Sequence, residues 1–175
     1  GAVLLGRLSD IVDYLLYVDK KTGLPNREKL NIYIGEMAGK VLPEAFTCFT
    51  LSLDNLSELT KRFGYTVGDG VLKDFAGLVQ LMGDTEGMRG YNGVGRFVVF
   101  FEECSSKKAA AMIRILDNQV EEYNSLNPEY PIRYTAAWAT TEETDTYEIR
   151  ELLRLSQKKW KQMEKEKKDK TEEET

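Results

Sequence analysis

The sequence contains no histidine and only two cysteines, and this scarcity removes several kinds of active site. Without histidine there is no Ser–His or Cys–His nucleophile, no imidazole zinc ligand and no histidine general base. Cys48 and Cys104 lie in or beside apolar, strand-like segments, so we expect both to be buried, reduced core residues. Any metal that this chain binds is therefore expected to be a hard, oxygen-ligated cation such as Mg²⁺.

Long apolar runs and an excess of basic residues are also missing. No run approaches the ~20 apolar residues of a membrane span, and the first ten residues lack the basic segment of a signal peptide. The formal net charge of −5 argues against a nucleic-acid partner, which requires a clustered basic face. We therefore expect this fragment to contact neither nucleic acid nor membrane. The length of 175 residues suits one domain, and the initial Gly in place of Met indicates a piece of a longer protein.

Hydrophobic periodicity predicts an alternating series of helices and strands. Helices are expected over about 4–15, 26–41, 55–63, 69–82 and 105–126 and from 147 onward, and strands over 46–53 and 132–140 with a hairpin at 89–101. In the second helix, Leu30, Ile34, Met37 and Val41 are expected to face inward. This order favours an α/β sandwich with a largely antiparallel sheet. Residues 166–175 are rich in Lys and Glu and are expected to be disordered.

The hairpin GYNGVGRFVVFF contains a glycine turn without an acidic residue. Gly93 and Gly95 separate two apolar segments, and such turns often bring backbone close to a phosphate. Chemistry at a phosphate usually needs a carboxylate that holds a metal, yet the turn offers only Val94, Gly95 and Arg96. Gly93 and Gly95 are thus expected to act first as turn residues.

Three stretches resemble one family, the GGDEF domains of diguanylate cyclases. Asp19-x-x-Thr22-Gly23-Leu24-Pro25-Asn26-Arg27 is similar to the family's D-x-L-T-G-L-P-N-R, and Leu53-Asp54 through Phe63-Gly64-Tyr65-x-x-Gly68-Asp69-x-x-Leu72 resembles its D-x-D-x-F-K-x-x-N-D-x-x-G-H-x-x-G-D-x-x-L. Gly93-Val94-Gly95-Arg96-Phe97 stands where the family has G-G-D/E-E-F. The resemblance implies a nucleotidyl-cyclase or ferredoxin-like sandwich over residues 19–165, with a five-stranded, mostly antiparallel central sheet flanked by helices. Residues 1–18 would then form a linker or signalling helix.

The family condenses two GTP molecules into cyclic di-GMP, with one GTP held by each protomer of a dimer. The resemblance implies Mg²⁺ ligands at Ser52 and Gly95 with the Leu53 carbonyl between them, and guanine contacts at Thr60 and Asp69. Of these five positions only Asp69 keeps the family's side chain. The implied vestigial nucleotide pocket consists of Ser52, Leu53, Asp54, Asn55, Ser57, Thr60, Asp69, Gly93, Val94, Gly95 and Arg96.

The missing carboxylates lead us to assign no catalytic residue and no metal ligand. Mg²⁺ sites depend on one or two protein carboxylates together with phosphates and water. Arg96 adds a cation instead, and a like charge ~4 Å away costs on the order of 4 kcal/mol at an effective dielectric of ~20. We expect a degenerate, non-catalytic regulatory or dimerisation module of a bacterial signalling protein, with no cofactor. Two alternatives to this non-catalytic module are an active diguanylate cyclase that uses Asp54 and a domain that senses GTP. Mg²⁺ is expected only for the active cyclase.

Several of these residues also have purely structural interpretations. Asp69 is expected chiefly to be the N-cap of the helix that follows Gly68, and Asp54 and Asn55 either cap the short helix or contact a ligand. Arg96 is expected to be a solvated turn residue, with direct phosphate contact as the alternative. The apolar face of residues 4–15 either covers the sheet or joins other domains of the same chain. The expected partners are GTP or another nucleotide, those domains and a second copy, in a cytoplasmic domain that can belong to a larger membrane-attached protein.

Overall fold

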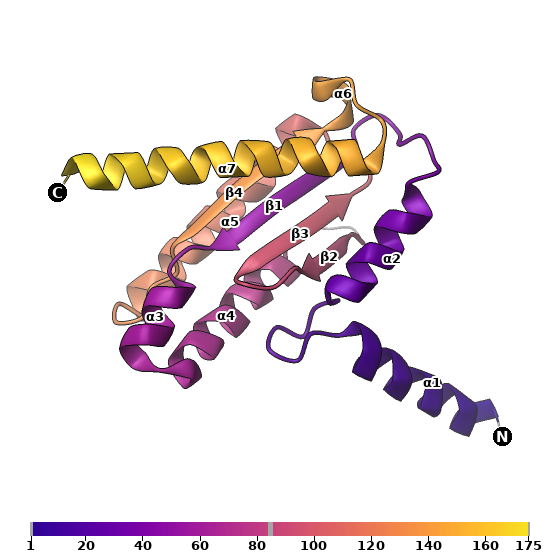
Figure 1. Ribbon diagram of the computed structural model, residues 1–175, viewed down its shortest axis with the longest axis horizontal. Helices are drawn as coiled ribbons and strands as arrows, with labels where there is room; N and C mark the ends of the chain where they lie inside the picture. Colours follow the sequence, from indigo (N-terminus) through magenta and orange to yellow (C-terminus); the bar gives the residue numbers. More distant parts are fainter. Residues whose placement is uncertain (1, 84–85, 175) are drawn as a thin grey trace.

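The structure is a computed structural model that describes residues 2–83 and 86–174, with the backbone alone at residues 2–4. Figure 1 shows helices packed around a single sheet. The helices are α1 Ala2–Tyr17, α2 Arg27–Met37, α3 Leu56–Phe63, α4 Tyr65–Gln80, α5 Ser106–Leu126, α6 Thr141–Thr144 and α7 Ile149–Glu174. The strands are β1 Thr47–Leu53, β2 Met88–Tyr91, β3 Arg96–Phe101 and β4 Tyr134–Thr140.

The sheet is antiparallel throughout, with the strand order β2-β3-β1-β4. The predicted mixed α/β class and antiparallel sheet are confirmed, but the described residues form four strands and not the expected five. The fifth strand was implied by the family resemblance, whereas the sequence pattern itself contained four strand segments, and all four are used. Between β4 and Glu174 the chain forms only helices α6 and α7 and their connection.

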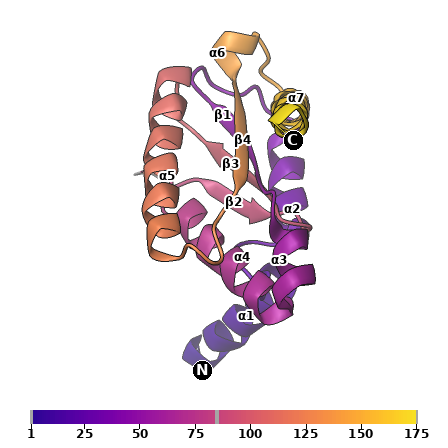
Figure 2. The ribbon, with the colours of Figure 1, turned by 90° about the vertical axis from the view of Figure 1, so that its left-hand side faces the viewer.

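Helices cover both faces of the sheet, which creates two apolar cores. Figure 2 shows α5 on one side of the strands and α2 and α7 on the other. The first core packs Phe49 and Phe97 of the sheet against Phe75 of α4, while the second includes Val98 and Leu152. Cys104 belongs to the first core and Cys48 to the second, and both are free and buried, as expected.

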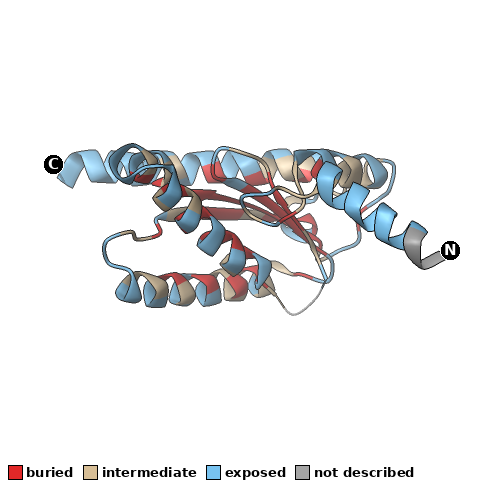
Figure 3. Ribbon diagram, turned by 90° about the horizontal axis from the view of Figure 1, so that it is seen from below, coloured by how far each residue is buried: buried red, intermediate tan, exposed pale blue. Residues whose placement is uncertain are grey.

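Helix α1 projects away from the sandwich and does not cover the sheet (Figures 1 and 3). Leu5 and Leu15 are 70% and 58% exposed, so the interpretation of α1 as a cover for the sheet is wrong. Its C-terminal end is nevertheless fixed to the domain. The Asn26 side chain donates a hydrogen bond to the Leu16 carbonyl at 2.8 Å, and the Asn26 backbone N–H donates one to the Tyr17 carbonyl at 2.9 Å.

Three other expectations differ from the structure. Helix α2 ends at Met37, so Val41 lies beyond it and is 85% exposed instead of facing inward. Helix α4 begins at Tyr65, four residues before Asp69. The tail predicted to be disordered is helical to Glu174, although its side chains are largely exposed (Figure 3). Charged pairs along α7 stabilise this exposed part of the helix, as such pairs do in isolated helices. None of the described helices combines the length and the apolar character that crossing a lipid bilayer requires.

Candidate functional site

The central strand β1 places the candidate site at its C-terminal end, beside the β2–β3 turn. Ser52 lies opposite Arg96 of β3 and opposite Thr135 of β4. A hollow of about 480 Å³ opens here, and it contains seven of the eleven predicted residues. They are Ser52, Leu53, Asp54, Ser57, Thr60, Val94 and Arg96, joined by Leu56, Lys61, Tyr65, Trp160 and Glu164.

Helix α7 lies along β1 and delivers Trp160 to this position. Ser156 Oγ lies 2.7 Å from Thr50 Oγ1, and Trp160 Nε1 donates a hydrogen bond to Ser52 Oγ at 2.7 Å. Four residues of helix advance about 6 Å and two residues of strand about 6.8 Å, so the two contacts match in spacing. Helix and strand therefore stay in register over this distance, and the indole is held over Ser52.

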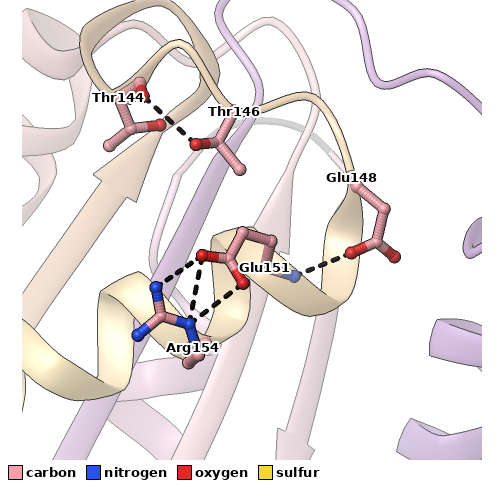
Figure 4. A network of polar contacts seen from close by, with 5 residues as sticks. All are labelled: Thr144, Thr146, Glu148, Glu151 and Arg154. Carbon is pink, nitrogen blue, oxygen red and sulfur yellow. Dashed lines mark hydrogen bonds and ion pairs between the residues drawn. The ribbon is translucent and has the colours of Figure 1, made fainter.

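The start of α7 is fixed by acidic and hydroxyl groups (Figure 4). Glu148 accepts hydrogen bonds from the backbone N–H groups of Arg150 at 3.1 Å and Glu151 at 2.8 Å, as a helix-capping residue does. Glu151 then pairs with Arg154, whose Nε donates a hydrogen bond to Glu151 Oε2 at 3.0 Å. In the preceding loop the Thr146 hydroxyl donates to the Thr144 carbonyl at 3.1 Å. These contacts set where α7 begins and hence where its later residues lie along β1.

A closed hydrogen-bond network surrounds Ser52. Its hydroxyl accepts from Trp160 and donates to Asp54 Oδ1 at 2.6 Å, while Thr135 Oγ1 donates to Asp54 Oδ2 at 2.6 Å. Ser52 is 5% exposed and Trp160 is 6% exposed. Both carboxylate oxygens of Asp54 thus have a hydroxyl donor, and the Ser52 hydroxyl has both a donor and an acceptor. The network is satisfied internally, which is the favourable state for buried polar groups.

Charge in the hollow is mixed. The Arg96 guanidinium lies 4.6 Å from the Trp160 ring centroid, a cation–π contact. Lys61 contributes a second cation, whereas Asp54 and Glu164 contribute anions. Glu164 also pairs with Lys168 at 3.2 Å. The hollow therefore lacks the uniformly positive surroundings that favour a triphosphate.

The β2–β3 turn is held by its own contacts. The Gly95 N–H donates to the Tyr91 hydroxyl at 2.8 Å, and the Arg96 N–H donates to the Gly93 carbonyl at 3.0 Å. Burial raises the pKa of Tyr91, which keeps its hydroxyl protonated. Gly93, Val94 and Gly95 have φ values of 82°, 54° and 74°, so the chain is left-handed at all three. Two turn amides that could approach a phosphate are thus already engaged.

The residues at this site do not fit a Mg²⁺ ion. Ser52 offers a neutral hydroxyl, Gly95 offers no side chain, and the oxygens of Asp54 are already occupied by hydroxyl donors. Across the described ranges no group of three or more His, Cys, Asp or Glu residues is arranged to hold a metal ion. Hard cations require several oxygen ligands in open positions, which this donor set lacks.

Four predicted pocket residues lie outside the hollow, namely Asn55, Asp69, Gly93 and Gly95. Asn55 occupies the N-cap position of α3 without a side-chain cap bond, and its amide instead holds Pro131 and Arg133 through their backbone groups at 2.7 and 3.1 Å. Asp69 lies inside α4 and pairs with Lys21 at 3.4 Å. The prediction that Asp69 is an N-cap is therefore wrong. Asn55 does hold the N-cap position of α3, but neither it nor Asp54 makes a side-chain capping bond there. For Asp69 the reason is that Gly64, with φ 92°, starts the helix earlier.

Sequence reasoning missed the importance of Trp160 and Thr135 for this site. Trp160 is buried, as a packing residue is. Its spacing after Ile149, Leu152 and Ser156 marks one buried helical face. That spacing indicates the inward direction of the indole but not the strand that it meets, since Ser52 is 108 residues away in sequence.

Comparisons with known proteins agree with this architecture. A family model described as diguanylate cyclase, GGDEF domain, matches residues 16–170. A diguanylate cyclase/phosphodiesterase structure from Caldicellulosiruptor saccharolyticus has a TM-score of 0.69 and 18% identity, with 89% of this chain and 91% of that chain covered. No curated protein matches the chain.

Two further similar structures contain additional helical segments. The S helix-GGDEF-EAL structure of LapD from Vibrio cholerae, bound to c-di-GMP, has a TM-score of 0.65 and 13% identity, covering 80% of this chain and 32% of that one. The coiled coil and GGDEF domain of DgcB from Caulobacter crescentus, in complex with c-di-GMP, has a TM-score of 0.60 and 16% identity, covering 79% and 78%. At these identities the likeness establishes the fold.

Proposed function

The chain belongs to the GGDEF domain family of diguanylate cyclases, and we propose that within this family it is a degenerate, non-catalytic module for regulation and dimerisation. The observation that carries this proposal is the contact of Trp160 Nε1 with Ser52 Oγ at 2.7 Å. Ser52 stands where the family resemblance implies an acidic metal ligand, and the indole occupies the hydroxyl of that residue. Arg96 lies over the same ring, so a guanidinium cation stands beside Ser52 and the indole.

The energetic argument is that a metal-bound triphosphate would have to displace this network. Removing the indole would leave Ser52 without its donor and would expose apolar ring surface, at a cost of about 1–3 kcal/mol for the hydrogen bond alone. The cation would then face Arg96 with a single carboxylate, Asp54, as its acidic ligand. Each of these terms opposes binding, and Glu164, the other acid of the hollow, is already paired with Lys168.

The assembly role rests on α1, which is exposed and yet fixed to the domain at Asn26. Among the similar structures, one joins an S helix and another a coiled coil to a GGDEF domain. By analogy, we propose that α1 connects this domain to other parts of its chain and to a second copy. A change in α1 would then reach the domain through the 18–26 turn, where Val18 and Pro25 form an isolated bridge.

The proposal is tested by incubating the purified chain with GTP and either Mg²⁺ or Mn²⁺ and measuring cyclic di-GMP by mass spectrometry. We expect no product above a protein-free control, even at high protein concentration and long incubation. Robust product would refute the proposal and favour an active cyclase. In that case Asp54→Ala should abolish the activity, because Asp54 is the acid nearest to Ser52.

A second candidate function is nucleotide sensing without turnover, and the hollow beside Lys61 and Arg96 favours it. Titration calorimetry with GTP, with and without Mg²⁺, separates this function from a purely structural role. Binding that needs no metal and weakens in an Arg96→Gln variant would support sensing, because the guanidinium would then contact the phosphates. No heat at millimolar GTP would remove this candidate.

A further inference from the structure

Helix α7 carries an uninterrupted row of positive charge on one side. At about 100° per residue, every residue between 150 and 168 that falls within one arc of about 80° is a lysine or an arginine. Because the helix rises about 1.5 Å per residue, this row is about 27 Å long. All of its members are exposed, and together they form the α7 cation stripe: Arg150, Arg154, Lys158, Lys161, Lys165 and Lys168.

The α7 cation stripe points away from the body of the domain. The buried residues of α7, among them Leu152, Ser156 and Trp160, lie on the opposite side of the helix, where Ser156 and Trp160 contact β1. Figure 1 shows α7 crossing one edge of the molecule and continuing past the end of the sheet. A flat partner laid against this side of α7 would therefore meet the cations of the stripe together.

Most of this charge is uncompensated. Arg154 pairs with Glu151, and Lys168 pairs with Glu164. Within residues 2–83 and 86–174, the other cations of the stripe form no ion pair. The net charge of the chain is −5, but at physiological ionic strength exposed charges more than about 8 Å away are largely screened. The acidic total used in the sequence analysis therefore does not describe what a partner meets at this face.

The composition of the stripe selects among anionic partners. A specific protein interface has an apolar centre in which lysine is depleted, and this arc contains no apolar side chain. Proteins hold single-stranded nucleic acid with aromatic side chains on which the bases stack, and the arc contains none. A nucleic-acid duplex presents its phosphates on a curved surface, so a straight stripe meets only part of them. An anionic bilayer surface, in contrast, attracts clusters of about four to eight Lys or Arg residues through charge alone.

We infer that the α7 cation stripe docks this domain against an anionic lipid surface, with α7 lying parallel to that surface. The stripe has no apolar side chain to insert among the lipids, so the contact is electrostatic, reversible and dependent on salt. Each cation close to such a surface strengthens binding about fivefold. The inference does not depend on the proposed function, because no member of the stripe lines the hollow at Ser52.

The test is co-sedimentation of the full chain with vesicles of phosphatidylcholine and phosphatidylserine in a two-to-one ratio, with vesicles of phosphatidylcholine alone as the reference. We expect binding only to the anionic vesicles. This binding should disappear between about 0.1 M and about 1 M salt, where the screening length falls from about 10 Å to about 3 Å. A variant of three stripe residues should weaken binding at least ~10-fold, namely Lys158→Gln with Lys161→Gln and Lys165→Gln.

The matched control removes the same charge from exposed lysines outside the arc, in the combined variant Lys73→Gln, Lys107→Gln and Lys159→Gln. Its binding should change less than ~2-fold, because the stripe is intact. Far-UV circular dichroism checks that both variants fold, which their exposed positions should allow. A control variant that loses as much binding as the stripe variant would overturn the inference, since only total charge would then matter.

Other outcomes separate this inference from its rivals and from the proposed function. Equal binding to phosphatidylcholine alone would show that anionic charge is not recognised and would overturn the inference. Tighter binding to a short DNA duplex than to the anionic vesicles, measured by fluorescence anisotropy at the same salt, would also overturn it in favour of nucleic acid. No binding to the anionic vesicles would overturn it and leave the proposed non-catalytic role standing, whereas cyclic di-GMP formation would refute that role and leave the lipid contact standing.

Discussion

Replacement of Trp160 by phenylalanine isolates the contact that closes the candidate site. The change removes the Nε1–H donor, which lies 2.7 Å from Ser52 Oγ in a buried setting, and keeps an aromatic ring in the core. A neutral hydrogen bond of this kind contributes about 1 kcal/mol. The smaller ring also buries less surface and attracts the Arg96 guanidinium less strongly. Together these losses should lower the free energy of unfolding by about 2 kcal/mol.

The assay is urea unfolding followed by far-UV circular dichroism, with a double-mutant cycle against Ser52→Ala. The coupling energy between Trp160→Phe and Ser52→Ala should be about 1 kcal/mol, since both remove the same hydrogen bond. Trp138→Phe is the matched control. The Trp138 indole donates to Ser106 Oγ at 3.3 Å and is only partly buried, so its replacement should cost less than that of Trp160.

Two results would refute this reasoning. One is a Trp160→Phe variant whose stability stays within about 0.5 kcal/mol of the parent, less than a single hydrogen bond contributes. The other is a coupling energy near zero, because Ser52 and Trp160 would then act independently. Either result would mean that the indole does not hold the site closed.

Three further predictions concern the turn and the second core. Val94→Gly should stabilise the protein by about 1 kcal/mol in urea unfolding, because a β-branched residue at φ 54° is strained and the side chain, 87% exposed, contributes little packing. Val41→Gly is the control and should destabilise the protein. Equal effects of the two changes would show that the backbone at Val94 is not strained. Gly95→Ala should cost about 1–3 kcal/mol by the same assay, since φ is 74° and an added Cβ would lie 3.0 Å from the Leu53 carbonyl oxygen; an unchanged midpoint would count against it. Burial raises the pKa of Cys48 from 9.0 to about 12, so between these pH values the thiol ionises only in the unfolded chain. The free energy of unfolding should therefore fall as pH rises, by up to about 1.4 kcal/mol per pH unit. Cys48→Ala should flatten this pH dependence, and an identical slope in the variant would refute the raised pKa of Cys48.

The elements of this fold were largely predictable because their signals are local. The hairpin around Gly93 and Gly95, the helix that begins after Ser105 and the strand at 47–53 all follow from turn residues, caps and apolar periodicity. The boundary errors have local causes as well. The positive φ of Gly64 starts α4 before the expected Asp69, and the early end of α2 moves Val41 into solvent.

The candidate site was predictable only in part because its decisive contact joins distant segments. The motif positions on β1 and the turn identified Ser52 and Arg96, which the structure brings together across the β1–β3 ladder. Trp160 reaches them from α7, and this placement depends on how the helix lies on the sheet. A helical pattern shows which side chains face inward, but it does not specify the residue that each one meets.

The most direct measurement of the central claim is a search for Mn²⁺ by anomalous X-ray scattering in crystals of this protein grown with a non-hydrolysable GTP analogue. Our account predicts no anomalous peak between Ser52 and Gly95, with the Trp160 indole still hydrogen-bonded to Ser52. A metal peak at that position, coordinated by Asp54, the Leu53 carbonyl and the phosphates, with the indole displaced, would contradict it.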